Sequence, residues 1–258
     1  MKKMLVSVIV AGLMTALGAG AASAQDKPPL MIPVDILACK YNEGKGPADL
    51  DAVVADWQEW VGTTEYDDDF SAWSLTKHYA GPEQEFDFLW LLAWRNGDAM
   101  GGAWGEYMEN GGEIAAKFGE MSNCPGAANF VSINHRPTPN NNTPGDGVLV
   151  FSDCMRKDGM SNQDVGRAMG QWSALLDSRK LDVGIFHWYP VFGGGGEPTF
   201  HFKEIYAFEN LQKFGNFYES MTNGGLYRDS QAITGPVMDC DVARVYNAKN
   251  RLSNNIRK

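Results

Sequence analysis

Residues 86–94 have the sequence Phe-Asp-Phe-Leu-Trp-Leu-Leu-Ala-Trp, and residues 200–208 repeat its pattern as Phe-His-Phe-Lys-Glu-Ile-Tyr-Ala-Phe. The two segments are 114 positions apart. Further matches at offsets of 114 to 116 positions are Cys39 with Cys154, Trp57 with Trp172, Asn96 with Asn210, and Cys124 with Cys240. Small loop insertions between duplicated segments produce offsets that drift in this way. The chain therefore contains two copies of one repeat of roughly a hundred residues.

Each copy has the pattern of strand, helix, strand, strand, helix, strand. Apolar residues alternate in the expected strands and follow an i, i+3, i+4, i+7 spacing in the first helix of each copy. In the first copy the elements are expected at residues 34–41, 48–61, 73–79, 86–94, 98–108 and 129–134. In the second they are expected at residues 148–154, 162–176, 183–191, 199–208, 211–221 and 241–246. This order is that of the ferredoxin-like fold.

The N-terminus is typical of a secretory signal peptide. Two lysines precede a short apolar stretch, and a run of small residues ends at Ala24. We expect cleavage there and release into the periplasm, because the apolar stretch is too short to serve as a membrane anchor. The expected organisation is a signal peptide at 1–24, a first unit at 25–136, a linker at 137–147 and a second unit at 148–258.

Composition excludes several classes of partner. The formal net charge is -10, and lysine and arginine are scattered along the chain. Such a protein lacks the basic surface that nucleic acids or anionic membranes require. Nucleic acid and a membrane surface are therefore not expected as partners. With 44% hydrophobic and 12% aromatic residues the chain can bury a core.

The four cysteines predict two disulfides. An oxidising compartment favours bridging, and the duplication favours Cys39 with Cys124 and Cys154 with Cys240. In a ferredoxin-like sheet the end of the first strand lies beside the start of the fourth, where these residues fall. Free buried thiols are the alternative. No two cysteines are close in sequence, so we expect no metal site.

The element order, the Phe-x-Phe third strands and the helices that begin after Asn96 and Asn210 resemble the dimeric α/β-barrel superfamily. The resemblance covers nearly the whole chain after the signal peptide. It implies an α+β fold in which two tandem ferredoxin-like βαββαβ units pack sheet to sheet as an intrachain dimeric α/β barrel. A monomer would then suffice. The superfamily includes cofactor-independent monooxygenases, isomerases, haem enzymes and proteins without a known reaction, so the fold does not select an activity.

One hairpin of the second copy could carry chemistry. If the turn is centred near Gly195, Tyr189 faces His201 and His187 faces Lys203, all on one side of the sheet. Imidazole titrates near neutrality, so these four residues are the candidate catalytic group. The alternative is that they are interior polar groups that satisfy one another.

Other candidates are weaker. Four residues of the first copy are candidate ligand-binding residues. Trp90 and Trp104 could stack on a ligand, and His78 is expected to face Asp87. The chain has no cofactor-binding motif, and we expect no cofactor.

Three functions remain open at this point. The first is a periplasmic protein that binds an apolar or aromatic ligand in the barrel cavity. The expected partner is then a small apolar or aromatic molecule bound in the barrel, if the cavity is open. The second is a cofactor-independent oxygenase or isomerase, with His187 or His201 as the base and Tyr189 or Lys203 holding the oxyanion. The third is a structural or interaction module whose barrel is filled by its own side chains. Whether the protein is an enzyme is left undecided by the sequence.

Overall fold

The structure is a computed structural model that describes residues 31–138, 145–193, 199–254 and 256. The first repeat forms β1 (Met31–Tyr41), α1 (Pro47–Val61), β2 (Phe70–Tyr79), β3 (Phe88–Trp94), α2 (Gly97–Asn110), α3 (Gly112–Met121) and β4 (Ser122–Arg136). The second forms β5 (Gly147–Arg156), α4 (Asn162–Ser178), β6 (Gly184–Phe192), β7 (Phe202–Phe208), α5 (Leu211–Thr222), α6 (Leu226–Ile233), β8 (Met238–Cys240) and β9 (Arg244–Leu252). Each element expected from the sequence has a counterpart in this order.

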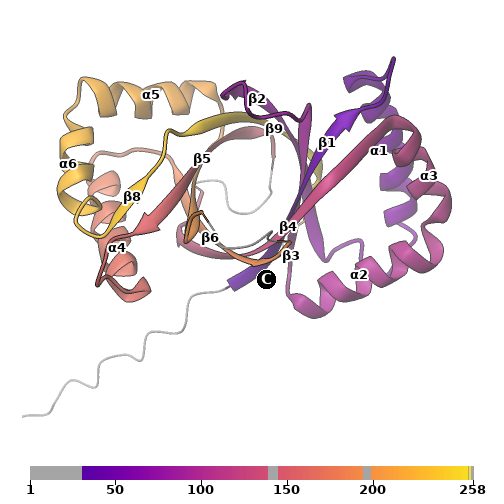
Figure 1. The fold of residues 1–258 in the computed structure, drawn as a ribbon, viewed down its shortest axis with the longest axis horizontal. Coiled ribbons are helices and arrows are strands. Elements are labelled where there is room, and N and C mark those ends of the chain that lie inside the picture. The colour runs from indigo at the N-terminus through magenta and orange to yellow at the C-terminus, as the bar shows by residue number, and fades with distance from the viewer. Residues whose placement is uncertain (1–30, 139–144, 194–198, 255, 257–258) are drawn as a thin grey trace, which may run out of the picture.

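The strands close into an antiparallel barrel. The ring order is β7-β6-β4-β1-β3-β2-β9-β5, a β5–β7 ladder closes it, and the short β8 pairs with β5. Figure 1 shows this ring with α1, α2 and α3 on one side and α4, α5 and α6 on the opposite side. The β4–β6 and β2–β9 ladders join the two repeats. The predicted α+β fold, with two ferredoxin-like units forming one barrel within the chain, is confirmed.

The alternation of side chains along each strand separates three apolar cores. One core lies between the sheet and helices α1 to α3, and a second lies between the sheet and helices α4 to α6. The third lies inside the barrel, with contributions from strands of both units. Successive strand residues point to opposite faces, so each strand serves the barrel interior and one helix layer.

Equivalent asparagine caps begin α2 in the first unit and α5 in the second. The side chain of Asn96 accepts a hydrogen bond from the backbone N–H of Ala99 at 2.8 Å, and Asn210 does the same with Lys213 at 3.0 Å. Such caps satisfy backbone donors that have no partner within the helix. Their recurrence explains why asparagine stands at matched positions of the two copies.

Two helices were not expected from the sequence. The second helix of the first copy was expected to end near Met108, but a further helix, α3, follows α2 after Gly111. In the second unit α6 follows α5 after three residues. Gly111 and Gly225 precede these extra helices at matched positions. Ile114 and Met121 of α3 and Leu226 of α6 are buried, so each short helix is held by tertiary packing.

Both predicted disulfides are confirmed. Cys39 is bonded to Cys124 and Cys154 to Cys240, and the described residues contain no free cysteine. Cys154 lies directly opposite Cys240 in the β5–β8 ladder. Each bridge closes a loop of 85 or 86 residues within its own unit.

Some expectations fall on residues outside the described ranges. These are the signal peptide at 1–24, most of the linker at 137–147 and the centre of the hairpin near Gly195. Among the described residues, no helix is long and apolar enough to cross a membrane.

Candidate functional site

The barrel encloses a cavity of about 510 Å³ at one end. Five small side chains from five different strands line it, and they are Ser71, Ala93, Ser132, Ala207 and Ala248. A packed interior ordinarily leaves few voids larger than a water molecule. The cavity therefore exists because small residues from several strands line the same part of the barrel interior.

Larger apolar side chains form the rest of the wall, among them Ile32, Val34, Leu91, Trp188 and Ile205. Polar residues gather at the outer end, where Asp146, Glu209 and Asn254 contribute to the lining. Ser71 Oγ donates to the carbonyl of Asn254 at 2.9 Å, which holds the C-terminal segment at this end. The cavity is thus apolar in its depth and polar at its mouth, which is the usual character of a small-molecule site.

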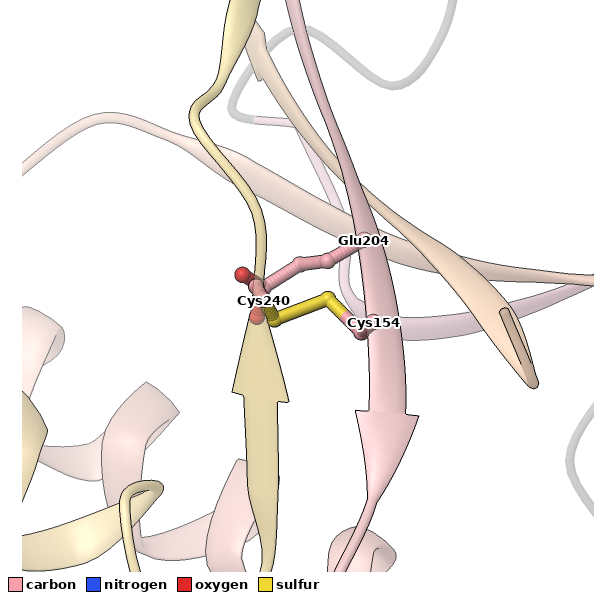
Figure 2. A group of neighbouring side chains, drawn as sticks. All are labelled: Cys154, Glu204 and Cys240. Carbon is pink, nitrogen blue, oxygen red and sulfur yellow. A yellow bond between two sulfur atoms is a disulfide. The ribbon is translucent and has the colours of Figure 1, made fainter. Parts of the chain in front are cut away.

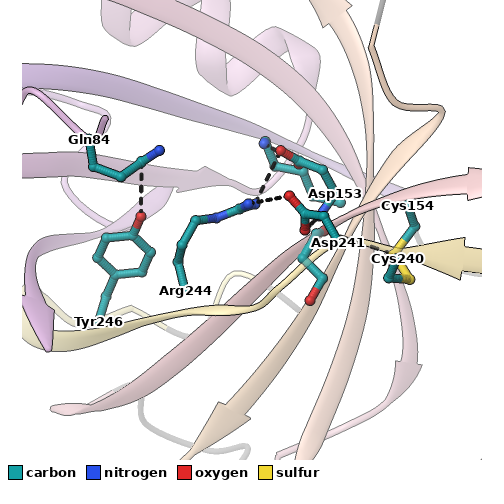
Figure 3. A network of polar contacts seen from close by, with 9 residues as sticks. Gln84, Asp153, Cys154, Cys240, Asp241, Arg244 and Tyr246 are labelled. Carbon is teal, nitrogen blue, oxygen red and sulfur yellow. Dashed lines mark hydrogen bonds and ion pairs between the residues drawn. A yellow bond between two sulfur atoms is a disulfide. The ribbon is translucent and has the colours of Figure 1, made fainter. Parts of the chain in front are cut away.

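A network of charged side chains crosses the opposite end of the barrel (Figure 3). The carboxylate of Asp153 lies 2.5 Å from Lys203 Nζ and 3.1 Å from Arg244, and Arg244 also pairs with Asp241 at 2.5 Å. Beside them the hydroxyl of Tyr246 lies 3.4 Å from the amide oxygen of Gln84. These contacts lie at the end of the barrel remote from the cavity mouth.

The four candidate catalytic residues do not share one face, and this part of the prediction is wrong. The β6–β7 ladder pairs His187 with Glu204 and Trp188 with Lys203, one residue away from the expected register. A slip of one residue moves a side chain to the other face of the sheet. Lys203 consequently joins the charged network in the barrel, whereas His187 lies in the core beneath the second helix layer.

Tyr189 and His201 also lie away from the cavity lining. Tyr189 packs against the same helix-side core as His187, and burial raises the pKa of its hydroxyl. The Nδ1 atom of His201 accepts a hydrogen bond from the backbone N–H of Arg156 at 2.9 Å. Whether any of these residues has a catalytic role stays a prediction, but they do not converge on either cavity described in this structure.

His201 and Asp87 occupy equivalent positions and make equivalent contacts. Asp87 Oδ2 accepts from the backbone N–H of Tyr41 at 2.8 Å, and Tyr41 aligns with Arg156 in the repeat. The backbone N–H groups of Asp87 and His201 both donate to the matched carbonyls of Cys39 and Cys154. In both units the side chain at this position forms a hydrogen bond that links the start of the third strand to the end of the first strand.

His78 does not face Asp87, contrary to expectation. The β2–β3 ladder ends with Thr76 opposite Phe88, which again differs by one residue from the expected register. The ring of His78 instead lies beside Tyr79, and its Nδ1 is 3.4 Å from the side-chain amide nitrogen of Asn247.

A buried cluster that the sequence did not reveal lies beneath α4. The rings of His135 and His187 are 4.3 Å apart, and His187 Nε2 is 3.7 Å from the carboxylate of Glu204. Tyr206 donates to Glu204 at 3.3 Å and accepts from Trp172 at 3.0 Å. Within the described residues, neither nitrogen of His187 has a hydrogen-bond partner.

Burial sets the charges of this cluster. It lowers the pKa of His187 to about 3 and raises that of Glu204 to about 7. Burial, with a smaller effect of His187, also lowers the pKa of His135 to about 3. His187 is therefore neutral at neutral pH. The imidazole and the carboxylate of Glu204 lie close together but do not form an ion pair.

Among the described residues, one group of potential metal ligands and two histidines are the candidate sites for a metal ion or haem. Cys154, Cys240 and Glu204 lie together, but the two sulfur atoms are bonded to each other and cannot serve as thiolate ligands (Figure 2). A histidine that serves as a haem ligand needs a ring nitrogen that faces an open cavity. The ring of His187 is stacked on Phe202 at 4.4 Å, and neither His187 nor His135 lines a cavity described here.

The two tryptophans expected to contact a ligand do lie together. Trp90 and Trp104 line a second cavity, of about 270 Å³, between the sheet and the helices of the first unit. Neither His78 nor Asp87 belongs to it.

No protein-family model matches the chain, and no curated protein matches its sequence. Solved structures, however, share its architecture. Chlorite dismutase from Candidatus Nitrospira defluvii in complex with imidazole is similar with a TM-score of 0.51 and 11% identity, over 84% of this chain and 90% of that chain. The chain has the dimeric α/β-barrel fold. An anthrone oxidase-like protein is similar with a TM-score of 0.50 and 10% identity, over 88% of this chain and 94% of that chain. Identities this low show a common fold and carry no activity across.

Proposed function

We propose that this dimeric α/β-barrel protein binds an apolar small molecule in the lumen of its barrel after export to the periplasm. The observation that supports the proposal is the cavity of about 510 Å³ that the five small residues line. Cavities of a few hundred cubic ångströms with an apolar wall and few polar groups are typical of ligand sites. A barrel filled by its own side chains would leave no such space.

The mouth determines how the ligand enters. Asp146, Glu209 and Asn254 lie at the open end, while Asp153, Lys203 and Arg244 occupy the other end. A ligand enters beside the polar residues and places its apolar part against Leu91 and Ile205. The acidic groups at the mouth disfavour an anionic ligand, so the ligand is neutral or carries its polar group at the entrance.

A neutral fluorescent probe tests this site. N-phenyl-1-naphthylamine is expected to bind the wild-type protein and to gain fluorescence, and Ala207→Phe is expected to weaken binding at least about tenfold by filling the lumen. Ala207 is 7% exposed and lines the cavity. Ala52→Phe on the exposed surface of α1 is the matched control and should bind normally. Equal binding by wild type and Ala207→Phe would remove the lumen as the site.

Export and oligomeric state are part of the proposal. The mature protein in a periplasmic fraction is expected to begin at Gln25 and to run as a monomer in size-exclusion chromatography. The two disulfides are compatible with this location. An N-terminus at Met1 in the cytoplasmic fraction would contradict it.

A further inference from the structure

Five of the eight tryptophans line the second cavity, the one between the sheet and helices α1 to α3. Six aromatic rings follow one another around it with centroids 4.7 to 6.1 Å apart, in the order Trp57, Phe70, Trp94, Trp104, Tyr107 and Trp60. The first and last rings, Trp57 and Trp60, both belong to α1, so the six rings nearly encircle the cavity. The cavity is an aromatic cage of about 270 Å³.

A buried carboxylate orients two of these rings. Asp35 is 9% exposed, and its Oδ2 atom accepts hydrogen bonds from Trp94 Nε1 at 2.8 Å and Trp104 Nε1 at 3.0 Å. Asn129 donates to the other oxygen at 2.7 Å. Because the carboxylate accepts from both indoles, it increases the electron density of their rings. An electron-rich indole face attracts a cation more strongly.

The second unit lacks this arrangement. Val150 stands at the position of Asp35, and Phe208 and Tyr218 stand at those of Trp94 and Trp104. The fold is formed equally well with either set, because both units adopt the same order of elements. The carboxylate and the two tryptophans are therefore not a requirement of the ferredoxin-like fold.

The rim of the cage is acidic. Glu106 and Tyr66 line the cavity, and the pKa of Tyr66 is raised by a hydrogen bond with Glu65, then by partial burial and by the charges of Glu65, Glu106 and Asp69. Gly102 allows Tyr66 to lie against α2, since a Cβ atom there would be 2.4 Å from the hydroxyl oxygen. The nearby cations are already paired, Arg95 with Asp69 and Lys117 with Asp56.

We infer that the aromatic cage of the first unit is a second binding site, distinct from the lumen, for a small organic cation such as a substituted ammonium ion. Aromatic cages with carboxylates nearby attract such cations through the faces of the rings, and the apolar walls accept their alkyl or aryl groups. The acidic rim raises the local concentration of the cation. The inference does not depend on what the lumen binds.

A charged probe and its neutral analogue test the inference. Benzyltrimethylammonium is expected to bind at least about fivefold more tightly than neopentylbenzene, which has the same shape without the charge. Calorimetry measures both affinities. Comparable affinities for the two probes, or failure of the cation to bind, would overturn the inference.

Substitutions locate the site. Trp104→Leu should weaken binding of the cation about tenfold and that of the neutral probe far less, while Trp104→Phe should retain most of it. Glu106→Gln should weaken only the cation, by about two- to fivefold, and less so in high salt. Glu109→Gln, on the same helix but outside the lining, is the matched control. Ala207→Phe, which fills the lumen, should leave cation binding unchanged, and loss of binding in that variant would place the cation in the lumen instead.

Discussion

The carboxylate of Glu204 lies 3.7 Å from Nε2 of His187, with both side chains buried beneath the helices of the second unit. Burial disfavours the charged form of each group, so the pKa of His187 is lowered to about 3 and the pKa of Glu204 is raised to about 7. The two shifts have opposite effects on stability. The His187 shift lowers stability as the pH falls from about 6.5 toward 3, and the Glu204 shift lowers it as the pH rises from about 4.5 to 7.

Glu204→Gln should therefore change the pH dependence of stability. Between about pH 4.5 and 7 the unfolded chain ionises Glu204 while the folded protein keeps it protonated, so the wild type loses up to about 3 kcal/mol that the variant retains. Urea unfolding at several pH values measures the difference in free energy between variant and wild type. That difference should become more favourable to the variant as the pH rises and level off above pH 7. Glu59→Gln, at an exposed position, is the control, and a difference that does not change with pH would contradict the assignment.

The matched contacts of His201 and Asp87 predict matched effects. His201→Ala and Asp87→Ala each remove one hydrogen bond to a backbone N–H, so each should lower the free energy of unfolding by about 1 kcal/mol. Binding of the neutral probe in the lumen should not change, since neither residue lines that cavity. Unfolding midpoints and probe titrations on the two variants give both quantities. If His201→Ala lost binding while keeping its stability, the residue would belong to a site after all.

The two disulfides should contribute almost equally to stability. Their loops span 85 and 86 residues, and the loss of loop-closure constraint is about 4 to 5 kcal/mol for either bridge in the chain-entropy model. The paired variants are Cys39→Ala with Cys124→Ala, and Cys154→Ala with Cys240→Ala. Chemical denaturation of the two double variants compares them directly. A clear inequality would show that one bridge also acts through packing in the folded state.

Asp153, which pairs with two cations at the end of the barrel, should contribute more to the free energy of unfolding than an exposed ion pair does. Asp153→Asn leaves Lys203 and Arg244 facing a neutral group, and we expect a loss of about 1 to 2 kcal/mol because the three side chains are only partly exposed. Asp239→Asn breaks an exposed pair with Lys157 and should cost less than about 1 kcal/mol. Urea unfolding at low and high salt measures both. Equal losses would mean that the network at the barrel end is no stronger than a surface pair.

The sequence predicted little about the two cavities. Trp90 and Trp104 were expected to contact a ligand and do line one cavity, but Asp35, which holds Trp104 by a hydrogen bond, gave no signal of its own. The sequence does not show whether an aspartate in an apolar strand faces solvent or is buried, because that depends on which side chains hydrogen-bond to it in the folded protein. Similarly, Ser71, Ala93 and Ala207 look like ordinary strand residues until the closed barrel places them around one cavity.

The repeat predicted the element order and the pairing of Cys39 with Cys124 and of Cys154 with Cys240, because periodicity and matched spacing are properties of the chain itself. The two-unit barrel was expected from the resemblance to the dimeric α/β-barrel superfamily. Only the tertiary structure decided the register of β6 against β7. That register is set by the packing of both sheet faces, and a shift of one residue exchanges those faces. For this reason His187 lies beside Glu204 under the helices, Lys203 lies inside the barrel, and the four residues expected to form one site are separated.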